Sequence, residues 1–236
     1  MPNASTPAAS FHTRWTRVGG ARGEAERSLL ALCLDNWYPV YAYLRHLGLP
    51  PEQAQDAARN FFGRLLEAAP DDAVTAAFGR FRRYLQTQLQ AFDPLRSSPA
   101  GANAPLSPLA LEALEARQLR ERAHTHTPEQ ALQRACALDL VARSLDQLRG
   151  EAAEAGRLAL YEALETYLGL DPGPDALQAI AERLRLRPVF AQMALTRLRE
   201  RFRELVDDAL GDTVVDGDEL DAERAALQSA LSGLRR

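Results

Sequence analysis

The sequence predicts an all-α protein made of two small helical domains, which are joined by a proline-rich linker, with a helix-turn-helix at the end of the second domain. Three observations support this fold class. Apolar residues recur with helical spacing along most of the chain, and no stretch keeps the strict alternation of a half-buried strand. Four prolines fall within residues 93–108, a composition that does not join a helical core easily. Near the end, a short and a longer helical pattern are separated by a few residues.

The first domain is expected to contain three helices. The earliest covers about residues 24–47, where Pro39 should kink or split it and Gly48 is placed to end it. The clearest pattern runs from Pro51 to Glu67, with apolar residues at i, i+3, i+4, i+7 and i+8, and Pro51 suits a first helical turn. Its other face carries Glu52, Gln55, Asp56 and Arg59. A third helix is expected over about residues 76–92.

The second domain is expected to begin near Thr127, after a short helix over residues 109–123. Thr127-Pro128-Glu129 is typical of an N-cap followed by proline at the first helical position. The helices that follow should cover about residues 128–148, 152–168, 174–184 and 188–210. A turn at residues 171–174, Asp-Pro-Gly-Pro, separates the second of these from the third.

Length and composition are those of a globular protein. A chain of 236 residues fits one large or two small domains, and 46% apolar with 25% charged residues argues against disordered, collagen-like and disulfide-rich classes. Cys33 and Cys136 lie far apart in apolar patterns, so we interpret both as small buried hydrophobic residues. The first residues have no signal-peptide pattern, and no apolar run approaches the roughly 18 residues of a membrane span. We therefore expect a cytoplasmic protein without membrane insertion.

Charge is distributed unevenly along the chain. All 28 basic residues are arginine, which suits contacts to phosphates and base edges and is equally typical of codon usage in GC-rich DNA. The net charge of −4 would count against a nucleic-acid binder. However, residues 176–203 hold seven arginines against two acids, a local +5, whereas residues 204–224 hold nine acids against one arginine, a local −8. The basic segment coincides with the predicted helix-turn-helix.

That helix-turn-helix has side chains suited to reading DNA. Residues 176–184 form its first helix, residues 185–187 the turn, and Pro188 opens the second helix. The outward positions of the second helix carry Gln192, Thr196, Arg197, Arg199, Arg201 and Arg203. Gln and Thr can read base edges, and Arg can pair with guanine or hold phosphates. The alternative interpretation is an arginine-rich solvated face of an ordinary helical bundle.

Two motif sets resemble the RNA polymerase sigma factors of the extracytoplasmic-function subfamily, in the branch that begins with a Thr-Arg-Trp-like motif. The first set comprises Phe11-His12-Thr13-Arg14-Trp15, residues 36–45 (NWYPVYAYLR), residues 51–67 (PEQAQDAARNFFGRLLE) and residues 79–85 (GRFRRYL). The second comprises residues 180–184 (IAERL) and 195–205 (LTRLRERFREL). The sets occur in the family's order, about 100 residues apart, and together cover most of residues 11–210.

The resemblance implies a two-domain transcription initiation factor without catalytic residues or cofactor. Residues 11–95 would bind core RNA polymerase and the −10 promoter element, residues 96–126 would be the linker, residues 127–210 would bind the −35 element, and residues 211–236 would be an acidic tail with a short apolar helix. Its partners would be core RNA polymerase and promoter DNA. An anti-sigma factor or another regulator is a further partner that the resemblance allows.

The resemblance also assigns residues to these partners. Those facing core polymerase would be Glu52, Gln55, Asp56 and Asn60; those near the −10 strand would be Arg80, Arg82, Arg83, Tyr84 and Arg96; and those at the −35 element would be Arg187, Gln192, Thr196, Arg197, Arg199 and Arg201. Exposed aromatic and arginine side chains suit unstacked bases. For Tyr84, burial with Phe81 and Leu85 is the alternative.

Several residues depart from the family pattern. Gln53 and Gln55 stand where the family has acids. Arg185 stands where it favours a turn glycine and Arg187 where an N-capping serine is usual, while Val189-Phe190 replaces smaller residues. An arginine that must adopt a positive φ is strained, although a different turn would avoid this. These departures leave a second hypothesis open: a sigma-derived protein that binds polymerase or a regulator but has lost promoter binding.

The remaining segments carry no recognisable chemistry. The tail has eight acids between Asp207 and Glu223, followed by Leu227, Leu231 and Leu234. It is either a solvated linker with a small docking helix, or its acids fold back on the arginines of residues 197–203 and compete with DNA. His124 and His126 lack a third metal ligand. No acid/base motif, phosphate loop or nucleophile elbow is present, so we expect neither an enzyme nor a metal site.

Overall fold

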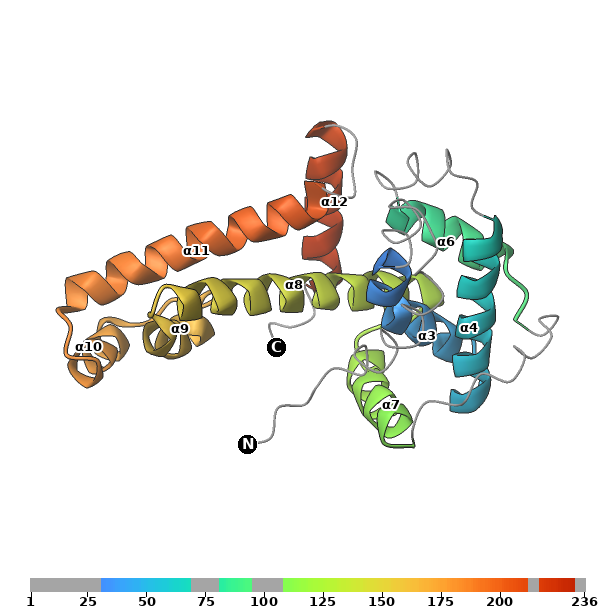
Figure 1. Cartoon of the computed structure of the whole chain (residues 1–236), viewed down its shortest axis with the longest axis horizontal. Coiled ribbons are helices and arrows are strands. Elements are labelled where there is room, and N and C mark those ends of the chain that lie inside the picture. The colour runs from blue at the N-terminus through green and yellow to red at the C-terminus, as the bar shows by residue number, and fades with distance from the viewer. Residues whose placement is uncertain (1–30, 69–80, 95–107, 212–216, 232–236) are drawn as a thin grey trace. The chain divides into compact units, whose positions relative to one another are not determined.

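The computed structural model describes residues 31–68, 81–94, 108–211 and 217–231, and all of their regular secondary structure is helical, which confirms the predicted all-α class (Figure 1). The helices are α3 (Trp37–His46), α4 (Pro51–Ala68), α6 (Phe81–Ala91), α7 (Pro108–Arg122), α8 (Pro128–Glu154), α9 (Leu158–Leu164), the 3-10 helix η2 (Glu165–Tyr167), α10 (Pro174–Arg183), α11 (Pro188–Gly211) and α12 (Gly217–Leu231). The chain forms two compact units. The first unit is Met1–Asp139 with Asp212–Arg236, and the second unit is Leu140–Gly211.

The predicted early helix is broken at Asn36 rather than at Pro39. Residues 31–35 are helical, and the Asn36 side chain turns back to donate from Nδ2 to the Leu32 carbonyl at 2.8 Å. Pro39 is then the third residue of α3, a position whose N–H would have no partner within the helix. Gly48 ends α3 as predicted, with φ of 95°.

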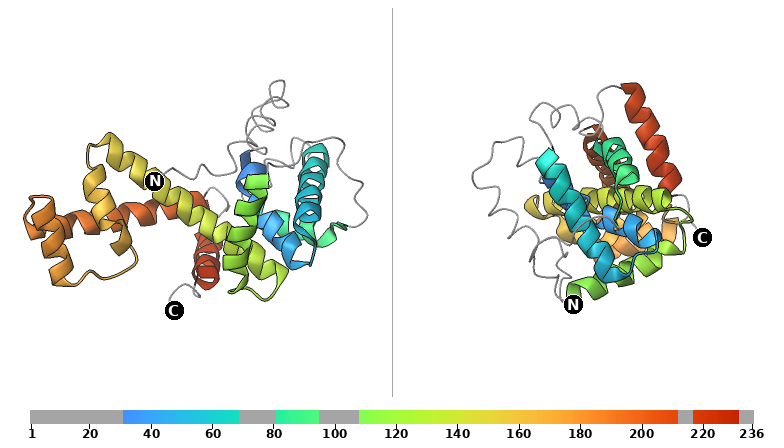
Figure 2. Two further views of the ribbon diagram at one scale, coloured as in Figure 1. Left: turned by 90° about the horizontal axis from the view of Figure 1, so that it is seen from below. Right: turned by 90° about the vertical axis from the view of Figure 1, so that its right-hand side faces the viewer.

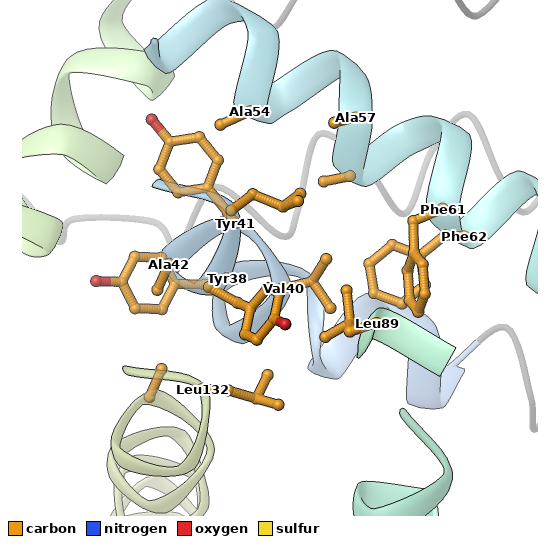
Figure 3. Packing of buried hydrophobic residues seen from close by; sticks show 14 of the residues in the cluster. Tyr38, Val40, Tyr41, Ala42, Ala54, Ala57, Phe61, Phe62, Leu89 and Leu132 are labelled. Carbon is orange, nitrogen blue, oxygen red and sulfur yellow. The ribbon is translucent and has the colours of Figure 1, made fainter. Parts of the chain in front are cut away.

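The core of the first unit forms where α3 packs against α4. Figure 3 shows side chains of α3 facing Ala54, Ala57 and Phe62 of α4, with Leu89 of α6 and Leu132 of α8 closing the cluster. The two helices lie side by side in every view (Figure 2). α4 matches its predicted bounds to within a residue, because its apolar stripe is long and continuous.

α7 lies in the stretch that was predicted to be a linker, and it belongs to the core of the first unit. Leu114 is buried in the same cluster as α3 and α4. Glu115 accepts hydrogen bonds from Arg45 Nε and Nη2, both at 2.7 Å, and from the Tyr41 hydroxyl. The predicted short helix over residues 109–123 is therefore correct, but it packs against the first unit instead of spacing two domains.

α8 begins at the predicted cap and runs across the boundary between the two units. The Gln130 amide donates to Thr127 Oγ1 at 3.2 Å, and Gln130 Oε1 accepts from the His126 amide at 2.9 Å, so two end groups of the helix are satisfied. The compact units consequently divide within α8, after Asp139, and not in the proline-rich segment.

α12 packs on the first unit through an apolar and a polar contact. Leu227 is buried, and the buried Arg134 of α8 donates from Nη1 to the Ala230 carbonyl at 2.9 Å. The docking helix expected in the tail is present; Leu234 lies outside the described residues.

Apolar residues of α11 take part in small cores of the second unit. One joins Ala191 and Leu195 of α11 to Leu177 and Ile180 of α10 and Leu164 of α9. Another groups Leu205 of α11 with Leu148 and Ala152 of α8 and Tyr161 of α9. The apolar residues of α11 therefore face the interior of the second unit.

Candidate nucleic-acid interface

The turn between α10 and α11 is a Schellman C-cap. The Arg185 amide donates to the Glu182 carbonyl at 3.1 Å, and the Leu186 amide donates to the Ala181 carbonyl at 2.8 Å. This geometry places Arg185 in the left-handed region, with φ of 54°. The chain thus uses the strained turn that the sequence raised as one alternative, with arginine in the usual place of glycine.

The first turns of α11 expose the polar side chains expected to read DNA. Gln192, Thr196 and Arg197 are all exposed, and Arg187 is exposed immediately before the helix. The Thr196 hydroxyl donates its hydrogen bond to the Gln192 carbonyl at 3.1 Å. For contact with a ligand, Thr196 therefore has its oxygen lone pairs as acceptors and its methyl group as an apolar surface. Four of the six residues proposed for the −35 element are therefore accessible and near one another along the chain.

Arg199 is instead engaged within the second unit. Its Nε and Nη2 donate to the Tyr167 carbonyl at 3.2 and 3.0 Å, and Nη2 also donates to the Leu170 carbonyl. These bonds tie α11 to the segment after η2. Its guanidinium satisfies carbonyls at a helix C-terminus, where a cation is favourable.

Arg201 is likewise held by protein groups. Its Nε and Nη2 form a two-pronged contact with the Glu151 carboxylate of α8 at 2.9 and 2.8 Å, and Nη1 pairs with Glu204 at 2.9 Å. The hydrogen bond from Arg201 lowers the pKa of Glu151. Arg197, Arg199 and Arg201 therefore do not form one continuous free basic face: of the three, only Arg197 has neither a hydrogen bond nor an ion pair from its guanidinium among the described residues.

Large apolar side chains accompany the polar ones at the start of α11. Val189, Phe190 and Met193 are 55%, 51% and 46% exposed. A pocket of about 430 Å³ opens beside Phe190 and Met193, and its lining includes Leu160 of α9 and the arginines Arg157 and Arg197. The sequence had pointed to Val189-Phe190 as unusual, but Met193 was missed because helical spacing alone does not distinguish an apolar residue at the edge of a stripe from one inside it.

Basic residues gather around the turn. Arg183, Arg185 and Arg187 are all exposed, and the acid just before them, Glu182, accepts a hydrogen bond from Gln178 Nε2 at 2.8 Å. The Arg187 guanidinium carbon lies 6.0 Å from the centre of the Phe190 ring. The end of the second unit that carries the turn is therefore both basic and partly apolar.

The four residues proposed to face polymerase do not share one exposed surface. Glu52 and Asp56 are exposed, and Asp56 Oδ1 accepts from Arg59 Nη1 at 2.7 Å. Asn60 is half-buried, whereas Gln55 is buried at 2% exposure. Ala58, Arg59 and Phe62 follow Gln55 by three, four and seven residues, so they share its face of the helix, and they are also buried. The buried strip of α4 is therefore wider than its apolar residues indicate.

Two of the five residues proposed for the −10 strand have described side chains. Arg83 is exposed, whereas Tyr84 is partly buried and packs against the core of the first unit. The packing alternative is therefore supported for Leu85, which belongs to that core, whereas the side chain of Phe81 lies outside the described residues. Arg80 and Arg96 lie outside the described residues, as does the side chain of Arg82.

Other candidate sites can be stated briefly for the described part of the chain. It contains no group of three or more His, Cys, Asp or Glu side chains placed to hold a metal ion. None of its helices combines the length and apolar character needed to cross a membrane. Cys33 and Cys136 are free thiols in the buried core, as predicted, and burial raises the pKa of Cys33 to about 12.

Comparison with protein-family models, curated protein sequences and solved structures finds no match to this chain. The functional interpretation therefore depends on the chain's own residues.

Proposed function

We propose that this protein is a sigma-type transcription initiation factor, which binds core RNA polymerase through its first unit and promoter DNA through α10, the turn and α11 acting as a helix-turn-helix. The observation that carries the proposal is the exposed set of Gln192, Thr196 and Arg197 on a helix that follows a basic turn. Such a helix fits the major groove, where Gln pairs with adenine and Arg with guanine. The ordered motifs of both domains support the same function. We place this activity in the cytoplasm and assign the protein no catalytic role.

DNA selection tests this proposal directly. The full chain is mixed with a pool of duplexes carrying a random segment, and the bound duplexes are recovered and sequenced. We expect a preferred sequence, and we expect Gln192→Ala to relax the preference at one base pair at a cost of about 1–3 kcal/mol. Gln147→Ala removes another exposed glutamine, on α8, and should leave the preference unchanged. Recovery of sequences no different from the starting pool would contradict promoter recognition.

A second candidate function is supported by the exposed apolar side chains. Val189, Phe190 and Met193 are large apolar side chains that are about half exposed, and Phe190 and Met193 line a pocket together with Arg157 and Arg197. Arg199 and Arg201 are already satisfied by protein groups. Clustered apolar side chains with a polar rim are typical of protein-binding surfaces. A sigma-derived protein that binds polymerase or a regulator, without reading promoters, would use this surface instead.

A further inference from the structure

Arg185 occupies a backbone conformation that costs free energy for any residue with a Cβ atom. It is the single non-glycine residue with a positive φ in the ranges that the structure describes. Two other helix ends there have the same pair of capping hydrogen bonds, after α3 and after α8, and both place glycine at this position: Gly48 with φ of 95° and Gly156 with φ of 66°. At the end of α10 the same motif is built with arginine, whose Cβ crowds the following carbonyl.

No contact of the Arg185 side chain offsets this cost. The side chain is exposed and makes no hydrogen bond or ion pair with the described residues. Its charged neighbours in the sequence, Arg183 and Arg187, have the same sign, and the nearest acid in the sequence, Glu182, accepts a hydrogen bond from Gln178. Backbone strain therefore disfavours arginine at this position in the isolated chain.

We infer that Arg185 is a phosphate-binding residue, which projects its guanidinium from the turn onto the backbone of duplex DNA held against α11. The inference rests on the proposed function and adds a residue to its site. A phosphate satisfies the planar guanidinium through paired hydrogen bonds, and the exposed Arg183 and Arg187 add positive charge to the same turn. Contacts of this kind fix the position of a protein on DNA but carry no base preference.

The test separates charge from strain with three substitutions at one position. R185G removes the charge and relieves the strain, R185Q removes the charge and keeps the strain, and R185K keeps both. R149Q removes an exposed arginine of α8 that pairs with Glu162 and serves as the matched control. Each full-length variant is titrated with one mixed-sequence duplex over a series of salt concentrations, and its thermal midpoint is measured in the absence of DNA.

We expect R185G and R185Q to reduce the slope of log affinity against log salt by about 0.9, which corresponds to a roughly eightfold loss of affinity at 0.1 M salt. R185K and R149Q should retain the wild-type slope. The thermal midpoint should rise for R185G alone, because glycine accepts the positive φ.

Two results would overturn the inference. If the wild-type chain binds duplex DNA and R185G keeps its full salt slope while gaining stability, the residue is only a strained cap, and the proposed function still stands. If the wild-type chain shows no salt-dependent binding to duplex DNA, the proposed function fails and the inference fails with it.

Discussion

At the scale of single residues, Glu115 is the centre of a group of polar contacts in the first unit. Its carboxylate receives two hydrogen bonds from Arg45 and one from Tyr41, and it thereby joins α7 to α3. Burial alone would raise the pKa of Glu115, but the hydrogen bonds from Arg45 and Tyr41 and the charge of Arg45 outweigh it and lower the pKa below its usual value. The folded state therefore favours the ionised carboxylate, and this preference stabilises the first unit.

The lowered pKa predicts an acid-dependent loss of stability. Because the folded-state pKa is depressed, the contribution is complete above the unfolded-state value of about 4.3 and disappears as the pH falls through the lower folded-state value. At pH 7 we expect Glu115→Gln to lower the free energy of unfolding by about 1–2 kcal/mol, toward the lower end for a hydrogen-bonded charge because the site is partly exposed. Urea unfolding at several pH values measures this difference, which should shrink below about pH 4.3.

Glu112 provides the control, because it is an exposed glutamate of the same helix. Glu112→Gln should leave the free energy of unfolding within about 0.5 kcal/mol of the wild type at each pH of the series. A Glu115→Gln effect that grows as the solution becomes acidic would contradict the assigned direction of the pKa shift.

At the scale of elements, local signals in the sequence located helix ends well. Thr127 caps α8, Gly48 ends α3 and Pro51 opens α4, since each depends on the residue's own side chain or backbone freedom. The break at Asn36 was not foreseen, because its cause is a side-chain hydrogen bond that competes with the helix. The packing of α7 could not be read from its neighbours in sequence, because Leu114 and Glu115 meet partners some 70 residues away.

The docking of α12 gives the prediction for this scale. Leu227 is 7% exposed, whereas Leu119 of α7 is 72% exposed. We expect Leu227→Ala to lower the free energy of unfolding by about 2 kcal/mol, because it removes buried methyl groups and leaves space beside them. Leu119→Ala should change it by less than about 0.5 kcal/mol. Unfolding is followed by fluorescence in a W15F background, where Trp37 reports on the core of the first unit.

Equal effects of the two leucine substitutions would show that α12 does not pack on the first unit. The same result would also mean that the hydrogen bond from the Arg134 guanidinium to the Ala230 carbonyl does not form. The prediction therefore tests whether the acidic tail ends in a structural helix.

At the scale of the whole molecule, the sequence predicted the helical class and the positions of α10 and α11. It did not predict which arginines of α11 bond to other parts of the protein. Gln192, Thr196 and Arg197 are exposed as expected, because each lies opposite the apolar stripe of α11. Arg199 and Arg201 lie on the same arginine-rich stretch, yet Tyr167 and Glu151 hold them. Periodicity gives the direction of a side chain from its own helix, and only tertiary packing gives what it meets there.

The proposed promoter binding depends on which arginines of the second unit are available to phosphate. An arginine bound to Glu151 is unavailable to phosphate unless the ion pair opens, whereas Arg183, Arg185, Arg187 and Arg197 have no acid partner among the described residues. The basic end of the second unit therefore retains enough charge for several phosphate contacts in a protein whose net charge is −4. This local excess is the physical basis of the proposed promoter binding.

Run-off transcription tests the central claim most directly. Core RNA polymerase is supplied with the full chain and with DNA fragments that carry the sequence recovered by selection, and transcripts are compared with those of core polymerase alone. The account predicts discrete transcripts that depend on both the chain and the selected sequence. Measurable binding of the chain to core polymerase without initiation above core alone would contradict the sigma-type function and favour the interaction protein.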